Sequence, residues 1–225
     1  MNPNNPTHTG RLIGVAMLTS FGIGIYSNFG LQGRLFAGAG ALVSAATHAG
    51  TIGLITLLSL GLGLLSLWVG LTLQAQFGPR HPRLSGMVLG LAVAGLAAAL
   101  LEMATLNLMR SLSEFHLSSA GQDGPRAEAL KAIVGGLRDG IHFPDKLLGG
   151  VSLFCFNLLL WQTRALPRPF AGAGMGAALL QMSTVALPLF GHGVFYPLLA
   201  PLALSHVATG LWLLARGFAA DDPRG

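Results

Sequence analysis

Charged residues are scarce in this 225-residue sequence and make up only 9% of it. Soluble domains carry about 25% charged residues, so this share and a mean hydropathy of +0.63 exclude an ordinary soluble protein. Acidic residues are the rarer kind, since 8 Asp and Glu stand against 13 Lys and Arg. We do not assign the basic excess to nucleic-acid binding, because these residues lie in short loops between apolar runs.

Cysteine is nearly absent as well, and the single one, Cys155, lies inside an apolar run. This excludes a disulfide within the chain and a thiolate metal cluster. The sequence also lacks a His-Glu-x-x-His metal motif, a serine nucleophile elbow and a kinase motif. Gly61-x-Gly63 has neither the preceding strand nor the lysine of a phosphate-binding loop. No motif therefore indicates a particular enzyme class.

What the sequence does contain is a series of long apolar runs. A transmembrane helix needs about 20 apolar residues to cross about 30 Å of hydrocarbon. We predict an all-α polytopic transmembrane helix bundle with about six spans, at residues 12–31, 51–73, 84–109, 141–161, 170–190 and 197–215. Residues 11–218 would form a single transmembrane domain between a disordered tail at 1–10 and a C-terminal tail at 219–225.

Two regions between the spans need separate interpretation. Leu35 to Phe77 has no charged residue, and it is too long for one span and barely long enough for two. We interpret Leu35 to Gly50, which is rich in small residues, as a short re-entrant or interfacial segment; two full spans, giving seven, is the alternative. Before span four, a polar region predicts an amphipathic outer helix, because apolar residues recur there at helical spacing: Leu130, Ile133, Val134 and Leu137.

Basic residues in the short loops predict the orientation. Cytoplasmic loops of membrane proteins carry an excess of Lys and Arg. Six spans place one purely basic set on the side of the N-terminus: Arg11, Arg80, Arg83, Arg164, Arg168, Arg216 and Arg224. We therefore predict a multi-pass protein of the inner membrane whose N- and C-termini are both cytoplasmic.

Several stretches are similar to a known family. They are the opening run from Arg11 to Thr19, the polar stretch leading to His142, Leu166-Pro167-Arg168 before a Gly-rich span, and the closing run from Leu211 to Phe218. In this pattern the chain resembles the bacterial membrane family catalogued as domain of unknown function 4386, over most of residues 11–218. That family is usually more polar after span one than residues 35–50 are here. The resemblance implies a fold and a membrane location, and it implies no mechanism.

Two ionisable residues inside predicted spans are candidates for a ligand site. Ionisable groups at membrane depth are expensive, so Glu102 and His206 are functional candidates by default. Asn107 and Arg110 share the outer level of Glu102 and complete the candidate ligand-binding set. The structural alternative is an ion pair of Glu102 with Arg110 or another outer base, and a neutral His206 bonded to a backbone carbonyl or to Ser205. If Glu102 and His206 face each other, they could form a proton relay or hold a polar ligand.

A second candidate site is a metal or haem centre on the outer side. His48, His142, His192 and Asp139 all fall at or near that level in the six-span arrangement. Neutral imidazoles and carboxylates suit Zn, Fe or Cu, whereas haem needs two histidines on facing helices. The alternative is that histidine is simply tolerated in loops and at span ends.

Three functions from different classes remain open on the sequence alone. The first is binding or passing a small apolar or amphiphilic ligand between spans three, four and six. The second is a membrane-embedded metal- or haem-dependent enzyme or redox protein, and the third is a structural subunit. Small-xxx-small motifs predict close helix contacts, which could also support a homodimer. These motifs are Gly10-xxx-Gly14, Gly86-xxx-Gly90 and Gly172-xxx-Gly176.

Overall fold

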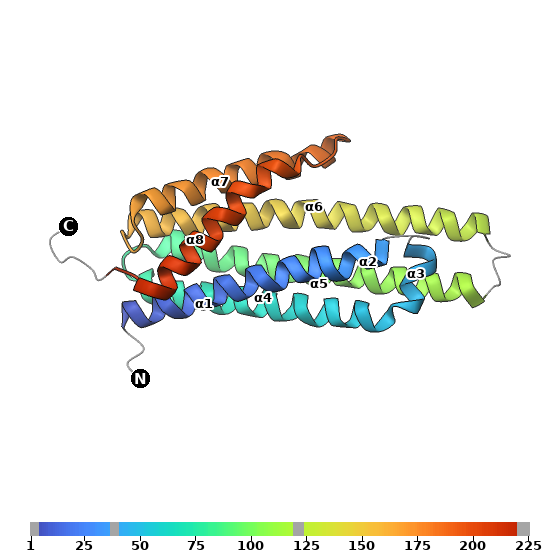
Figure 1. The fold of residues 1–225 in the computed structure, drawn as a ribbon, viewed down its shortest axis with the longest axis horizontal. Coiled ribbons are helices and arrows are strands. Elements are labelled where there is room, and N and C mark those ends of the chain that lie inside the picture. The colour runs from blue at the N-terminus through green and yellow to red at the C-terminus, as the bar shows by residue number, and fades with distance from the viewer. Residues whose placement is uncertain (1–4, 37–40, 119–123, 220–225) are drawn as a thin grey trace.

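A computed structural model describes residues 5–36, 41–118 and 124–219 of the chain. Within these ranges all regular structure is helical and no strand occurs (Figure 1). Among the described residues, 6 helical segments are long and apolar enough to cross a membrane: Pro6–Leu35, Ala49–Phe77, Pro82–Ser118, Glu128–Gln162, Arg168–Phe190 and Tyr196–Arg216. The all-α bundle is therefore confirmed, with six candidate spans rather than seven.

The first span begins earlier than the sequence indicated. Helix α1 (Pro6–Ile25) starts within the predicted N-terminal tail, because the Asn5 side chain accepts hydrogen bonds from the backbone N–H groups of Thr7 and His8. Proline at the first helical position fits this start, since it has no N–H group to satisfy. The helix continues through a π-helical segment, η1 (Tyr26–Gln32), into α2 (Gly33–Phe36). Residues 1–4 of the predicted tail lie outside the described ranges.

A short helix, α3 (Ala41–Thr47), occupies the region predicted to be re-entrant or interfacial. Its Ala46 N–H donates a 3.0 Å hydrogen bond to the hydroxyl oxygen of Ser113, a buried residue of α5 (Pro82–Ser118). Its 7 residues are too few to cross a bilayer. The next helix, α4 (Ala49–Phe77), is therefore the second span.

The predicted amphipathic outer helix is not separate from span four. Both belong to one helix, α6 (Gly124–Gln162), which contains Pro144 without ending there. At 1.5 Å per residue, α5 and α6 are each about 55 Å long, well beyond the hydrocarbon thickness. Their connecting ends extend past the α7–α8 turn along the long axis of the molecule (Figure 1).

The last two spans are joined by a compact turn. Helix α7 (Arg168–Ala186) gives way to the 3₁₀ segments η2 (Leu187–Phe190) and η3 (Tyr196–Leu199), which lead into α8 (Ala200–Arg216). Helix α7 ends at Ala186, two residues before Pro188, whose ring cannot continue the α-helical hydrogen bonds. The Thr184 hydroxyl group fixes the turn, because it accepts from the Phe195 N–H at 2.7 Å and donates to the Phe195 carbonyl at 3.1 Å.

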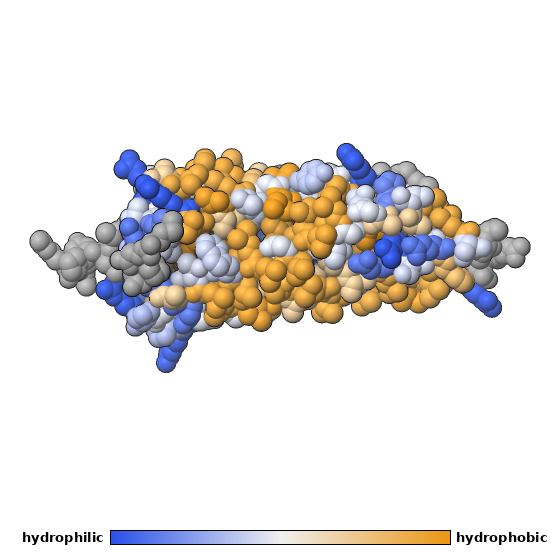
Figure 2. Space-filling model, turned by 90° about the horizontal axis from the view of Figure 1, so that it is seen from below, coloured by the Kyte–Doolittle hydropathy of each residue, from blue (hydrophilic) through white to orange (hydrophobic). Residues whose placement is uncertain are grey.

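The two ends of the bundle differ in charge. Both termini and the α4–α5 and α6–α7 connections lie at one end, which we call the terminal end, while α3 lies at the opposite end, the α3 end (Figure 1). A hydrophobic belt separates hydrophilic atoms at the two ends (Figure 2). In the described part of the chain, the acidic residues are all on α5 and α6: Glu102, Glu114, Glu128, Asp139 and Asp145. The terminal end instead has six described arginines: Arg11, Arg80, Arg83, Arg164, Arg168 and Arg216.

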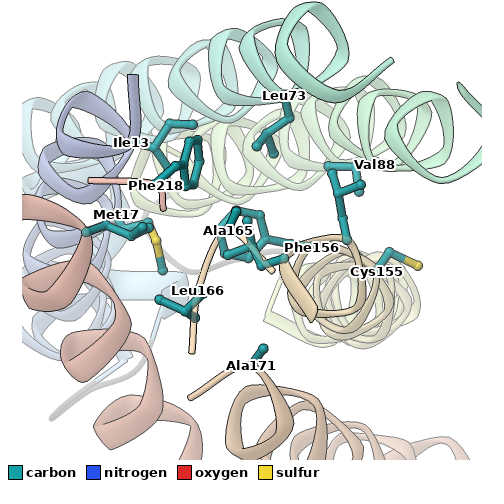
Figure 3. Close-up of a cluster of buried hydrophobic side chains, with 13 residues drawn as sticks. Ile13, Met17, Leu73, Val88, Cys155, Phe156, Ala165, Leu166, Ala171 and Phe218 are labelled. Atoms are coloured by element: carbon teal, nitrogen blue, oxygen red, sulfur yellow. The ribbon is translucent and has the colours of Figure 1, made fainter. Parts of the chain in front are cut away.

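A dense apolar core holds the terminal end together. Phe218, just beyond α8, packs near Ile13 in this core (Figure 3). The backbone of Gly217 makes the entry possible with a φ of 70°, and the Ala219 N–H donates to the Ala165 carbonyl at 3.1 Å. The three residues from Gly217 to Ala219, just beyond α8, are thereby held against the helices.

Only one of the three predicted glycine motifs lies at a backbone contact. A Cβ atom on Gly14 would lie 2.6 Å from the Leu214 nitrogen, and one on Gly10 would collide with the Phe218 backbone. This confirms close packing of α1 on α8. Gly90 and Gly176, in contrast, have open space beside them. The homodimer through small-residue faces stays a prediction.

Candidate functional site

Glu102 on α5 meets a row of basic side chains on α6. Arg138, His142 and Lys146 are four residues apart, so they project from one face of the helix. Glu102 Oε1 lies 2.8 Å from His142 Nδ1 and 3.6 Å from Arg138 Nη2, and its Oε2 lies 3.6 Å from Lys146 Nζ. With only 3% of its surface exposed, Glu102 is a buried carboxylate whose charge these groups balance.

The cluster continues from α6 to the first span. Arg138 Nη2 donates a 2.9 Å hydrogen bond to Gln32 Oε1, and Gln32 Nε2 donates to Asn28 Oδ1 at 3.3 Å. Both amides belong to η1, the π-helical segment, and Asn28 Nδ2 donates back to the Gly24 carbonyl. Single π-helical turns are rare and occur frequently at functional sites. We therefore include η1 in the candidate site.

The depth of the cluster follows from its contact with α7. Gln181 Nε2 donates a 2.8 Å hydrogen bond to the Lys146 carbonyl, which places Lys146 at the level of Gln181. Gln181 precedes the end of α7 by about 8 Å of helix rise, so Lys146 lies inside the span. Arg138 lies about 12 Å farther out along α6. The cluster thus runs from the level of the α7–α8 turn into the membrane interior.

A cavity of about 230 Å³ adjoins the buried carboxylate. Lys146 and Glu102 line it, together with hydroxyl and amide groups from α4 and η1: Ser27, Asn28, Gln32, Ser59 and Ser66. Its other lining residues are glycines and small or apolar side chains. This first cavity can therefore accept a polar group that forms several hydrogen bonds.

A second cavity of about 220 Å³ shares Leu62 and Ser66 with the first. It lies toward the terminal end, and most of its wall is apolar, including Val69, Val88 and Phe156. Ser66 is exposed on the surface of α4, near the middle of that span. The two cavities are therefore neighbours: the first has charged, hydroxyl and amide groups in its wall, the second is mostly apolar, and the Ser66 that both share is exposed.

His206 lines the second cavity and contacts the first span. Its Nε2 lies 3.3 Å from the Met17 carbonyl oxygen, and its ring stacks on Phe21 with the centroids 5.8 Å apart. Ser205 does not bond to it, because that hydroxyl donates to the Leu202 carbonyl. The structural alternative of a backbone-bonded histidine agrees with this contact, and His206 also reaches the cavity. Glu102 and His206 do not touch; they line neighbouring cavities.

The other two ligand candidates have local partners. Asn107 Nδ2 donates to Thr56 Oγ1 at 3.3 Å and to the Met103 carbonyl at 2.9 Å. Arg110 pairs with Glu114 at 3.2 Å rather than with Glu102. Neither Asn107 nor Arg110 lines one of the two cavities. The outer base that pairs with Glu102 is supplied by α6.

The four metal candidates are dispersed. His48 Nδ1 bonds to the Ser44 carbonyl at 2.8 Å, His192 is exposed in the α7–α8 turn, and Asp139 lies 3.7 Å from Arg138. His142 alone joins the buried cluster. Over the described residues, no group of three or more His, Cys, Asp or Glu side chains could hold a metal ion.

Arg138, Lys146 and Gln32 are not among the ligand-binding and metal candidates named from the sequence. The available signal was the spacing of three basic residues at i, i+4 and i+8 in a helix that enters the membrane. An isolated glutamate in a neighbouring span needs such a partner. Gln32 had no comparable signal, because its role depends on how η1 meets α6.

Comparison with known proteins gives one match. The family model described as Domain of unknown function (DUF4386) matches residues 12–217. No curated protein matches the chain. No solved structure matches it either.

Proposed function

The chain belongs to the family described as domain of unknown function 4386, and within that family we propose that this multi-span membrane protein binds a small amphiphile inside its helix bundle. One observation carries the proposal: a polar cavity and an apolar cavity adjoin through the shared residues Leu62 and Ser66. A molecule with a polar head and an apolar body matches such a space in both parts.

The polar head would occupy the first cavity. Glu102 and Lys146 supply charges of both signs there, and the surrounding hydroxyl and amide groups donate and accept hydrogen bonds. Because Glu102 is already balanced by basic residues, the head need not carry a net charge. We therefore propose a neutral or zwitterionic head rather than a strongly charged one.

The apolar body would extend past Leu62 into the second cavity. The exposed Ser66, which lines both cavities, lies near the middle of α4, where the bundle faces lipid. A ligand that dissolves in the bilayer could enter sideways without crossing the water-facing ends. This favours an amphiphile over a water-soluble substrate.

The other two functions receive less support. A metal- or haem-dependent enzyme would need the outer histidines and carboxylates together, and His48 and His192 lie apart from His142 within the described ranges. A purely structural subunit would leave a buried charged cluster beside a cavity without a role, although such groups are expensive in a membrane.

A co-purification experiment tests the proposal. Wild type, Leu62→Trp and Leu64→Trp are purified in the same mild detergent, and retained small molecules are identified by native mass spectrometry. Leu62 forms the wall that both cavities share, whereas Leu64 is 51% exposed on the same helix and serves as the matched control. We expect one amphiphile in wild type and in the control, and at least about tenfold less in Leu62→Trp, because the indole fills the space.

Two results would contradict amphiphile binding. One is a wild-type protein that retains no small molecule beyond the detergent and bulk phospholipid found with the control. The other is a Leu62→Trp protein that retains the same amphiphile as fully as wild type does. Circular dichroism of the three proteins shows whether each is folded, so a loss caused by misfolding is recognised.

We further propose that the terminal end faces the cytoplasm of the inner membrane. Within the described ranges, the short α4–α5 and α6–α7 connections at this end and the helix ends beside them contain basic residues and no acidic one, which supports the positive-inside arrangement: Arg80, Arg83, Arg164 and Arg168. In a Cys155→Ala background, Gln162→Cys and His192→Cys place single thiols at opposite ends. A membrane-impermeant maleimide added to cells with a permeabilised outer membrane should label only His192→Cys, and labelling of only Gln162→Cys would reverse the orientation.

A further inference from the structure

His206 has one ring nitrogen whose role is set by its contact with the first span. The Met17 carbonyl oxygen can only accept a hydrogen bond, so Nε2, 3.3 Å away, must carry the proton. In a neutral imidazole the other nitrogen, Nδ1, then has a lone pair and acts only as an acceptor. The tautomer of His206 is therefore fixed by the α1–α8 contact.

Nδ1 has no partner in the part of the chain that the structure describes. The interactions of His206 there are the Met17 carbonyl and the stacked Phe21 ring. Nδ1 is not fully buried in the protein either, so a ligand or solvent can reach it. Because Nδ1 is neither paired nor fully buried and His206 lines the second cavity, we infer that this acceptor faces the mostly apolar space of that cavity.

A ligand in the second cavity determines whether Nδ1 is satisfied. A ligand without a hydrogen-bond donor would cover Nδ1 and remove it from any solvent in the cavity, which is costly for an unpaired acceptor. A ligand with a hydroxyl group would donate to Nδ1 instead. Sites built around a buried polar group discriminate strongly against analogues that lack its partner.

We propose that the amphiphile carries a hydroxyl group on its apolar part and donates it to Nδ1 of His206. The ligand class is thus a phenol or an alcohol with an apolar ring or chain, and ethers, esters and hydrocarbons of the same shape bind less well. This inference rests on the amphiphile-binding function proposed above and names the chemical class of its ligand.

Two small probes differ only in the group that matters. 1-Naphthol has a hydroxyl donor, whereas 1-methoxynaphthalene has the same rings and can only accept. Their binding is measured by fluorescence on protein in lipid nanodiscs. The signal from protein-free nanodiscs, which reports partition of the probe into lipid, is subtracted. We expect wild type to prefer 1-naphthol by about tenfold or more, which is the size of effect for one unpaired buried acceptor.

Two substitutions separate the acceptor from the rest of the histidine. His206→Asn places an amide oxygen at the position of Nδ1, and the preference for 1-naphthol should be retained. His206→Gln places its amide near the position of Nε2, where it can still donate to the Met17 carbonyl. This variant has no acceptor at the position of Nδ1, so it should bind 1-naphthol and 1-methoxynaphthalene about equally. Thermal unfolding of both variants serves as the control for folding.

Three results would each overturn the hydroxyl inference: equal binding of the two probes to wild type, no specific binding of either, or an undiminished preference in His206→Gln. Such a result leaves amphiphile binding intact if Leu62→Trp still expels the co-purified molecule. If Leu62→Trp expels nothing, amphiphile binding itself fails, whatever the two probes show.

Discussion

The terminal end and the α3 end of the bundle are built in different ways. At the terminal end, Phe218 and its neighbours fill the space between helices, and α1 packs directly on α8 at Gly10 and Gly14 (Figure 3). Toward the α3 end, a Cβ atom added to Gly22 or Gly24 of the same helix would meet no atom within 4 Å, and the first cavity opens beside Gly24. One helix thus changes from tight packing to open space along its length.

This difference suggests a division of roles, in which the terminal end mainly stabilises the fold and the α3 end mainly serves binding. The packed core around Phe218 fixes the arrangement of the helices at the terminal end, and three of its members, Met17, Val88 and Phe156, also line the second cavity. The polar half can then hold a charged group and a cavity, which cost stability, because the helices are positioned elsewhere. We expect substitutions at the terminal end to affect folding first, and substitutions at the α3 end to affect binding as well.

The largest expected effect is at Phe218. Phe218→Ala should lower the free energy of unfolding by about 3–5 kcal/mol, because the residue is 1% exposed and its removal leaves a cavity. Phe190→Ala, at a residue that is 76% exposed in the α7–α8 turn, is the matched control and should change little. Thermal or denaturant unfolding in detergent provides the measurement, and equal effects of the two substitutions would remove the contrast between the ends.

Glu102→Gln should have the next largest effect. Removing the carboxylate takes away the counter-charge that Arg138 and Lys146 share, although Arg138 keeps Asp139 at 3.7 Å and Lys146 keeps Asp145 at 2.7 Å. Breaking a buried ion pair costs about 3–5 kcal/mol when no other partner remains. We expect about 2 kcal/mol here, because Asp145 and Asp139 still offset part of the charge of Lys146 and Arg138. Retention of the co-purified amphiphile should fall together with stability.

The control for that substitution is Glu114→Gln. Glu114 also pairs with an arginine, Arg110, but the Glu114 side chain is exposed and that of Arg110 is partly exposed. Exposed pairs contribute about 0–1 kcal/mol, so this variant should unfold almost as wild type and retain its ligand. A Glu102→Gln protein as stable as Glu114→Gln would show that the buried cluster does not depend on its carboxylate.

The smallest expected effect is at Asn107. Asn107→Leu removes the hydrogen bond to Thr56 that joins α5 to α4, and such bonds between membrane helices contribute about 0.6 kcal/mol. Because Asn107 lines neither cavity, ligand retention should not change. Native mass spectrometry and unfolding of the same sample check both parts, and loss of the amphiphile would extend the site to this residue.

Much of the fold could be predicted because it depends on local properties of the chain. The length and apolarity of each run are sufficient to identify a span, because a helix that crosses the membrane needs about 20 apolar residues whatever it packs against. Glu102 and His206 could be singled out as candidates for the same kind of reason. An ionisable group inside an apolar run is costly in a membrane whichever helices that run packs against, so it can be recognised from the sequence alone.

The partners of those residues could not be predicted, because they depend on how the helices are rotated against one another. In a membrane both the lipid-facing and the core-facing sides of a helix are apolar, so periodicity does not mark the buried face. On α4, Leu73 is 0% exposed and Leu64 is 51% exposed, although both are leucines in one apolar run. Helix packing therefore selected α6 rather than Arg110 as the partner of Glu102, kept His48 and His192 away from His142, and created the two adjoining cavities.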